Sequence, residues 1–246
     1  MKHYLYILFI VLCSELSAQN IRKSFENNRL TEEEIDYVIK EYGQKKDIPD
    51  EFREQIATAL LYFPELKDTR ISFRIYDASS PLLARPTFFS AVFRNARRRH
   101  YIIGISNDQN MAPVLLENLH LDAQIGVLGH ELAHIADFVK RDRIGLLGVA
   151  LGNIHKKKMD RIEFDADRRT IDHGLGWQLY SWSTHVRLAY AKHVQGIDQI
   201  EDITEVTEHN PRERYMFPET IMETIKSHPI YQPIEDDDGE SFTQSE

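Results

Sequence analysis

Two histidines four residues apart, inside a helical pattern, constrain this chain more than any other feature. Residues 129–138 read GHELAHIADF. On a helix, His130 and His134 project from the same face, one turn apart. Two imidazoles in that arrangement can bind a single Zn²⁺ ion. Glu131 lies about 100° further round the helix, where it can take a proton from a zinc-activated water, as the general base does in hydrolases of the His-Glu-x-x-His type.

The residues around this motif predict a buried helix. One face carries apolar residues at helical spacing, which would fix the helix in a core, namely Ile125, Leu128, Leu132 and Ile135. Gly126 and Gly129 stand just before the histidines, although glycine costs a helix about 1 kcal/mol relative to alanine. The two glycines therefore predict that another element packs closely against this helix.

A hydrolytic zinc ion usually takes three protein ligands and leaves a fourth position for water. One known arrangement needs glycine at 137 and histidine at 140, but the chain has Asp137 and Lys140. The other needs a carboxylate from a later helix. Glu163 and Asp167 are four apart and share a helical face, so Glu163 can bind the metal while Asp167 reaches the free ring nitrogen of a ligand histidine. An acidic helix facing solvent is the alternative for this segment.

HELAH at 130–134 followed by EFDAD at 163–167 resembles the HExxH…ExxAD pattern of gluzincin metallopeptidases. The most similar patterns are those of the CAAX-processing zinc protease family and the soluble minigluzincins. The resemblance covers roughly residues 100–190. It implies a zincin-like fold, with His130, His134 and Glu163 as zinc ligands, Glu131 as general base and Asp167 as a support for a ligand. Family members that process prenylated proteins have several membrane-spanning helices, and this sequence shows none, so the substrate is not carried over.

The order of local patterns predicts an α+β fold. Helices are expected over residues 31–42, 49–62 and, with interruptions, 115–196. Strands are expected over residues 71–76, 88–93 and 101–106. A small sheet with helices before and after it is an α+β arrangement. In a zincin-like fold an edge strand lies beside the metal-binding helix, and we assign that place to 101–106, with a central position as the alternative.

The two ends of the chain differ from its middle. Residues 1–18 combine a basic start, an apolar run of about ten residues and a small-residue exit, which is typical of a secretory signal peptide. Residues 235–246 are acidic and polar and are expected to be disordered. We therefore expect a metallopeptidase domain over 19–234 in a protein that is periplasmic or secreted, with membrane tethering as an alternative.

Composition limits the partners. The formal net charge of −9 argues against nucleic-acid binding, and the basic turn at 94–100 is interpreted as a solvent-exposed hairpin tip. No integral membrane domain is expected once the signal segment is removed, because no other apolar run approaches about 20 residues. We therefore expect the partner of this chain to be a peptide or protein substrate.

Hydrolysis of a peptide bond also needs a donor that stabilises the oxyanion. The candidates are His173, Tyr180, His209 and Tyr215, and His173, ten residues after Glu163, is favoured. The expected function is an exported zinc-dependent metallopeptidase. The alternative is a zinc-stabilised protein-binding module that is catalytically inactive or autoinhibited.

Overall fold

The computed structural model describes residues 21–78, 80–95, 98–142, 144–146, 156–194 and 214–232. The predicted signal segment 1–18 and the predicted tail 235–246 lie outside the described residues. Among the described helices, none combines the length and the apolar character needed to cross a membrane.

The fold is α+β, as the sequence predicts, with one four-stranded sheet in the order β1-β2-β4-β3. The first half of the chain forms α2 (Glu32–Tyr42), β1 (Lys46–Asp47), η1 (Asp50–Phe52), α3 (Arg53–Leu61), η2 (Pro64–Leu66), β2 (Arg70–Tyr76), β3 (Leu82–Pro86), α4 (Phe88–Phe93) and β4 (His100–Ser106). The second half is helical, with η4 (Gln109–Val114), η5 (Leu116–Asn118), α5 (Leu121–Lys140), α7 (Lys156–Asp172), α8 (Gly176–Val194), α10 (Pro218–Ser227) and η6 (Pro229–Tyr231).

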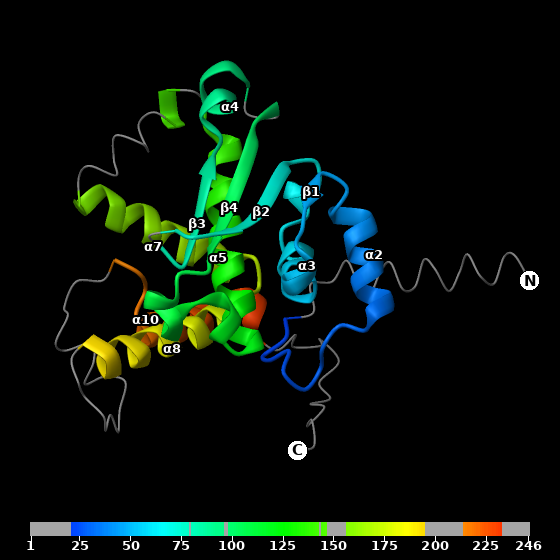
Figure 1. The fold of residues 1–246 in the computed structure, drawn as a ribbon. Coiled ribbons are helices and arrows are strands. Elements are labelled where there is room, and N and C mark those ends of the chain that lie inside the picture. Colours follow the sequence, from blue (N-terminus) through cyan, green and yellow to red (C-terminus); the bar gives the residue numbers. More distant parts are fainter. Residues whose placement is uncertain are drawn as a thin grey trace, which may run out of the picture.

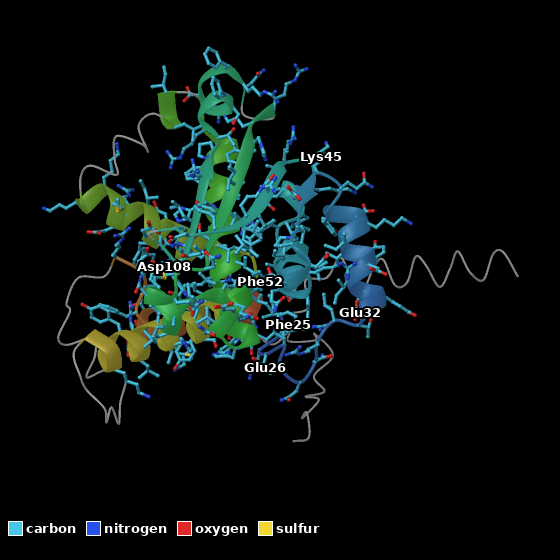
Figure 2. The ribbon with its side chains drawn as sticks, viewed as in Figure 1. Phe25, Glu26, Glu32, Lys45, Phe52 and Asp108 are labelled. Atoms are coloured by element: carbon cyan, nitrogen blue, oxygen red, sulfur yellow. The ribbon has the colours of Figure 1, made fainter. Side chains whose placement is uncertain are left out.

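Helix α5 is the centre of the molecule. In Figure 1 it runs past the sheet, with α2 and α3 on one side and α7, α8 and α10 on the other. It contacts α3, α7, α8 and β3, and nearly all of its residues are buried. Side chains fill the space between these elements (Figure 2), and Phe25 and Phe52 belong to the largest cluster of buried hydrophobic residues. The helix with the two histidines is therefore held rigidly from several directions.

The first two helices confirm the signals that predicted them. The Thr31 hydroxyl accepts a hydrogen bond from the Glu34 backbone N–H, and the Glu34 carboxylate accepts one from the Thr31 backbone N–H. This capping box satisfies donors that the first turn of α2 would otherwise leave open. Helix α3 follows η1 and ends just before Pro64, where a proline cannot continue the hydrogen-bond pattern.

The strand predicted over 88–93 is wrong, because these residues form the short helix α4. A short apolar run does not distinguish a strand from a helical turn. Here Phe89 and Phe93 stack at helical spacing, with ring centroids 6.4 Å apart. The strand lies earlier, at 82–86, where buried Leu82 and Ala84 alternate with exposed neighbours.

The edge strand is also different from the one assigned from the sequence. The segment 101–106 belongs to β4, which lies between β2 and β3 and is therefore central. The strand beside α5 at the edge of the sheet is β3, which pairs antiparallel with β4, with Ala84 opposite Ile103. The sequence pattern did not predict β3, and without β3 the edge strand on that side would be β4.

The two glycines of α5 mark a close helix crossing, as predicted. A Cβ atom on Gly126 would lie 2.2 Å from the backbone oxygen of Gln178 in α8. A Cβ atom on Gly129 would lie 2.7 Å from the Leu175 side chain. Helices α5 and α8 therefore approach too closely at Gly126 to admit a side chain, whereas at Gly129 the Leu175 side chain would have to move.

We expect Gly126→Ala to destabilise the fold by about 3 kcal/mol, because backbone rather than a flexible side chain must move to admit the methyl group. The measurement is the free energy of unfolding in denaturant. Gly145→Ala is the matched control, because the nearest atom there belongs to the Asp142 side chain, at 3.0 Å. Equal stability of the two variants would contradict the close crossing.

The buried Arg99 joins the sheet to the end of α5. Its Nη1 donates hydrogen bonds to the backbone oxygens of Phe138 and Arg141, at 3.1 and 2.7 Å. Phe138 lies in the last turn of α5, where its carbonyl also accepts the Arg141 backbone N–H, and Arg141 is the residue that ends the helix. The start of β4 and the C-terminal end of α5 are consequently held together.

Candidate metal centre

Three side-chain atoms meet between α5 and α7. His130 Nε2 lies 3.1 Å from His134 Nε2 and 3.2 Å from Glu163 Oε2, and His134 Nε2 lies 3.1 Å from the same oxygen. Both imidazoles are buried, and the Glu163 side chain is nearly so. These are the residues that could hold a metal ion.

The spacing of these atoms fits a small tetrahedral cation. Two ligands at about 2.0–2.1 Å from a tetrahedral Zn²⁺ ion are about 3.3 Å apart, close to the three observed separations. Three acceptor atoms directed at one point repel each other unless a cation or a proton lies between them. A set of two imidazoles and one carboxylate is a common one for zinc. The residues present therefore fit a zinc ion.

The pKa shifts of His130 and Glu163 follow from the close approach of these side chains. Burial alone would lower the pKa of His130, but the carboxylates of Asp167 and Glu163 outweigh burial and raise the pKa well above its ordinary value. Burial alone would raise the pKa of Glu163, yet its hydrogen bonds with His130 and His134 lower it far below the ordinary value. The Glu163 carboxylate is thus ionised, and the three facing atoms favour a positive charge between them.

Asp167 orients the first histidine. Its Oδ1 accepts a hydrogen bond from His130 Nδ1 at 2.7 Å, which leaves the Nε2 lone pair facing the cluster. Its other oxygen, Oδ2, accepts a hydrogen bond from the Met216 backbone N–H at 2.7 Å. A carboxylate fixed at both oxygens holds the imidazole in one orientation.

We expect Asp167→Asn to lower zinc affinity by about 10- to 100-fold, because the amide is a weaker acceptor for the His130 N–H and carries no charge. Competition with a chromophoric chelator measures this. Asp165→Asn, two residues away on the exposed face of α7, is the control and should bind zinc like the wild type. Equal affinities in the two variants would contradict a supporting role for Asp167.

Glu131 is buried beside the cluster and faces the sheet. Its Oε2 accepts a hydrogen bond from the Ala84 backbone N–H of β3 at 2.5 Å. Burial raises the pKa of Glu131, while the Coulomb interactions with the neighbouring His134 and His130 oppose the rise. A carboxylate with a raised pKa is closer to the proton affinity that a general base needs near neutral pH.

Residues near the C-terminus complete the surroundings. The Tyr215 ring lies 5.6 Å from the His130 ring and 5.7 Å from the Trp182 ring, centroid to centroid. Arg214 Nη2 lies 3.3 Å from Glu163 Oε1, the oxygen that does not face the histidines. Burial raises the pKa of Tyr215, so its hydroxyl keeps its proton and can donate a hydrogen bond.

Of the four candidate oxyanion donors, the structure brings only Tyr215 to the cluster among the described residues. His173 is bound elsewhere: its Nδ1 contacts the Arg169 backbone oxygen, its Nε2 lies 2.7 Å from Glu65 Oε1, and its ring stacks on Phe63. Tyr180 lines a different surface depression, with Trp177. His209 lies outside the described residues.

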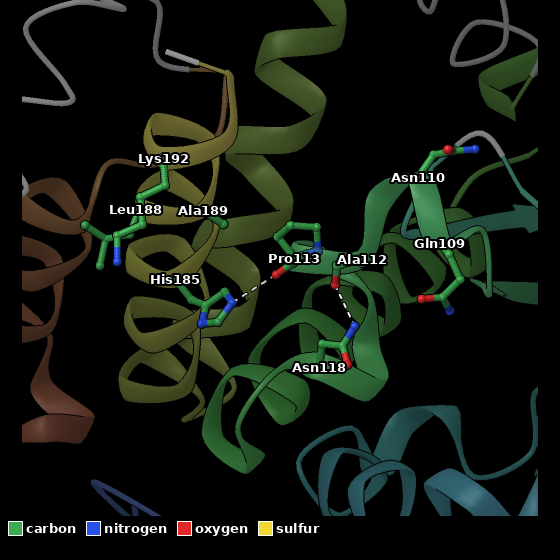
Figure 3. Close-up of a pocket in the computed structure, with 9 residues that line it drawn as sticks. All are labelled: Gln109, Asn110, Ala112, Pro113, Asn118, His185, Leu188, Ala189 and Lys192. Carbon is green, nitrogen blue, oxygen red and sulfur yellow. Dashed lines mark hydrogen bonds between the residues drawn. The ribbon is translucent and has the colours of Figure 1, made fainter. Parts of the chain in front are cut away.

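Two cavities differ in their relation to the cluster. A cavity of about 190 Å³ is lined by His130, Glu131 and Tyr215. Its other walls are the apolar Pro81, Leu82, Val114, Val127, Trp182 and Val186 and the polar Ser80, Ser183 and Arg187. A larger cavity of about 820 Å³ lies between η4 and α8 (Figure 3) and is lined by none of the cluster residues. The smaller cavity is therefore the one that adjoins the candidate metal centre.

Comparison with protein-family models, with curated proteins and with solved structures finds no match to this chain. The class of protein is consequently defined by fold and site alone. It is an α+β protein with a buried His-His-Glu group that could hold a metal ion.

Proposed function

We propose that this chain is an exported zinc metallopeptidase of the gluzincin type, acting on peptides or proteins. The observation that carries the proposal is the convergence of His130 Nε2, His134 Nε2 and Glu163 Oε2 within 3.1–3.2 Å. Glu131 is buried next to them, which pure metal binding does not require. The signal pattern at 1–18 supports export.

The side chains suit hydrolysis of an amide. A zinc ion held by the two histidines and Glu163 would supply a Lewis acid that polarises the scissile carbonyl and acidifies a water molecule. Glu131 would take one proton from that water as its oxygen bonds to the carbonyl carbon, and would give the proton to the nitrogen as the C–N bond breaks. The Tyr215 hydroxyl, whose pKa burial raises further above neutrality, would donate a hydrogen bond to the developing oxyanion.

The edge of the sheet offers a place for an extended substrate. Thr87 N–H and the Pro81 carbonyl bond to β4, so the backbone groups of Leu82 and Ala84 point to the other side of β3. Ala84 N–H already binds Glu131, while Leu82 N–H and the Ala84 carbonyl would remain for strand addition. The 190 Å³ cavity beside Glu131, with its mostly apolar walls, would receive one apolar substrate side chain.

The test measures zinc content and proteolytic activity on the same purified protein. The purified chain should retain about one zinc per molecule and should cleave an unstructured protein such as casein. Treatment with 1,10-phenanthroline should abolish cleavage, and added Zn²⁺ should restore it. A chain that binds no zinc after incubation with the metal would overturn the proposal.

One observation favours the alternative of an autoinhibited protein. Arg214 pairs with Glu163, and Tyr215 packs against the His130 ring, so residues 214–215 border the same centre. If zinc is bound and casein stays intact, cleavage should appear in an Arg214→Ala variant, which removes the ion pair with Glu163 and keeps the Tyr215 hydroxyl. Continued inactivity of that variant would instead support a zinc-stabilised binding module.

A further inference from the structure

The connection between β3 and β4 exposes large hydrophobic side chains at one end of the molecule. Phe89 and Phe93 of α4 are 76% and 69% exposed, and their rings stack on each other. Isolated exposed hydrophobic residues are common, but a contiguous aromatic pair on a projecting segment marks an interaction site. We call residues 85–95 together with Arg98 the aromatic tip.

A third exposed residue lies at the same end. Among the large hydrophobic residues exposed in the described part of the chain, the three most exposed are Ile144, Phe89 and Phe93, with Ile144 at 80%. Ile144 follows the C-terminal end of α5, which Arg99 holds to the start of β4. In Figure 1, α4 and the short segment that follows α5 are both at the end opposite to α8 and α10.

The charge of this region opposes that of the whole chain. Residues 78–107 contain five arginines and no aspartate or glutamate, although the chain has a net charge of −9. Arg85, Arg94 and Arg98 are exposed, and among the described residues none of the three forms a salt bridge. The pKa of His100, at the start of β4, is lowered first by burial and then by Arg70 and Arg74 of β2 and by Arg94, with Asp47 opposing.

We propose that the aromatic tip docks on an anionic membrane surface, with Phe89 and Phe93 inserted among the lipids and Arg94 and Arg98 at the phosphate groups. Aromatic side chains that enter the interface, flanked by cations that face anionic lipid headgroups, are the combination by which peripheral proteins bind bilayers. The proposal is independent of the metallopeptidase activity, because α4 contributes no residue to the metal centre.

Other partners fit the tip less well. Nucleic acids are disfavoured by the strongly acidic remainder of the chain, which would repel phosphates beyond the small basic region. A second copy of this chain, packed tip to tip, would bring the arginines of both copies together across a two-fold axis. An anionic lipid surface can bind both kinds of residue, because its apolar interior suits the phenylalanines and its phosphate groups suit the arginines.

The first experiment reports on the tip itself. In the full chain, Phe89→Trp should shift its emission to the blue and be quenched by brominated lipids in phosphatidylcholine vesicles that contain phosphatidylglycerol. The shift should be absent with phosphatidylcholine alone. Tyr190→Trp, at an exposed aromatic position on α8, is the matched control and should show neither effect. An unchanged Phe89→Trp spectrum would overturn the proposal, even if the chain binds vesicles through another segment.

The second experiment separates insertion from charge in vesicle co-sedimentation. Phe89→Ser/Phe93→Ser and Arg94→Gln/Arg98→Gln should each lower partitioning by about 10-fold or more, and salt should weaken the wild type. Lys192→Gln/Lys226→Gln removes the same charge from α8 and α10 and should partition like the wild type. Equal partitioning of all variants would overturn the proposal. So would tip-dependent self-association or binding of single-stranded DNA in the absence of vesicle binding.

Discussion

Glu163→Gln is expected to lose zinc almost completely during purification. The amide keeps the shape of the side chain but removes the negative charge and replaces a strong ligand for zinc by a weak one. Only His130 and His134 would remain, and two ligands hold zinc poorly in water. Because the loss of a supporting partner alone costs about 10- to 100-fold in metal affinity, we expect the loss of a direct ligand to cost more than about 100-fold.

Zinc content after dialysis, measured by mass spectrometry, tests this expectation. Asp165→Asn is the matched control, because it removes a carboxylate from the same helix at a position that does not face the histidines. A thermal unfolding series gives an independent readout, since a ligand that binds only the folded state raises the unfolding temperature. Added zinc should stabilise wild type and Asp165→Asn but not Glu163→Gln. Wild-type zinc retention in Glu163→Gln would remove Glu163 from the site.

The parts of the centre that could be predicted from the sequence are those fixed by helical geometry. A spacing of four residues places His130 beside His134 whatever the rest of the fold does. The same spacing places Glu163 and Asp167 on one face of α7. Their meeting across two helices needed one further step, the requirement of zinc for a third ligand. The structure brings these residues together.

The residues that escaped prediction reach the centre through tertiary structure. The Ala84 N–H is a backbone donor of a strand that the sequence pattern did not separate from α4. Met216 N–H lies 49 residues beyond Asp167, and no periodicity connects two such distant positions. His173 was favoured for its nearness in sequence, but ten residues of helix place it about 15 Å along the axis from Glu163.

The aromatic tip illustrates the same limit. An apolar run followed by arginines was interpreted as a strand and a solvated turn. The run forms a helix with exposed rings instead. Exposure depends on what the rest of the chain leaves uncovered, so sequence patterns alone do not predict it.

Glu131→Gln is expected to keep its zinc and to lose hydrolysis by a factor of about 10² to 10⁴, the usual contribution of a general base. Glutamine has the same shape, and its carbonyl oxygen can still accept the Ala84 N–H bond. It has no basic oxygen that could take the proton of the attacking water. Because burial already raises the pKa of Glu131, a neutral side chain should leave the free energy of unfolding unchanged or slightly higher.

Three measurements on the same preparation test this variant: zinc per chain, unfolding temperature and casein cleavage. Wild type and Glu131→Gln should agree in the first two and differ only in the third. If zinc is lost as well, the activity result would say nothing about a base, because the centre itself would have been damaged. Cleavage at the wild-type rate with zinc in place would remove Glu131 from the reaction. The buried Glu131 carboxylate, which accepts a hydrogen bond from the edge strand β3, would then have a structural role in the fold.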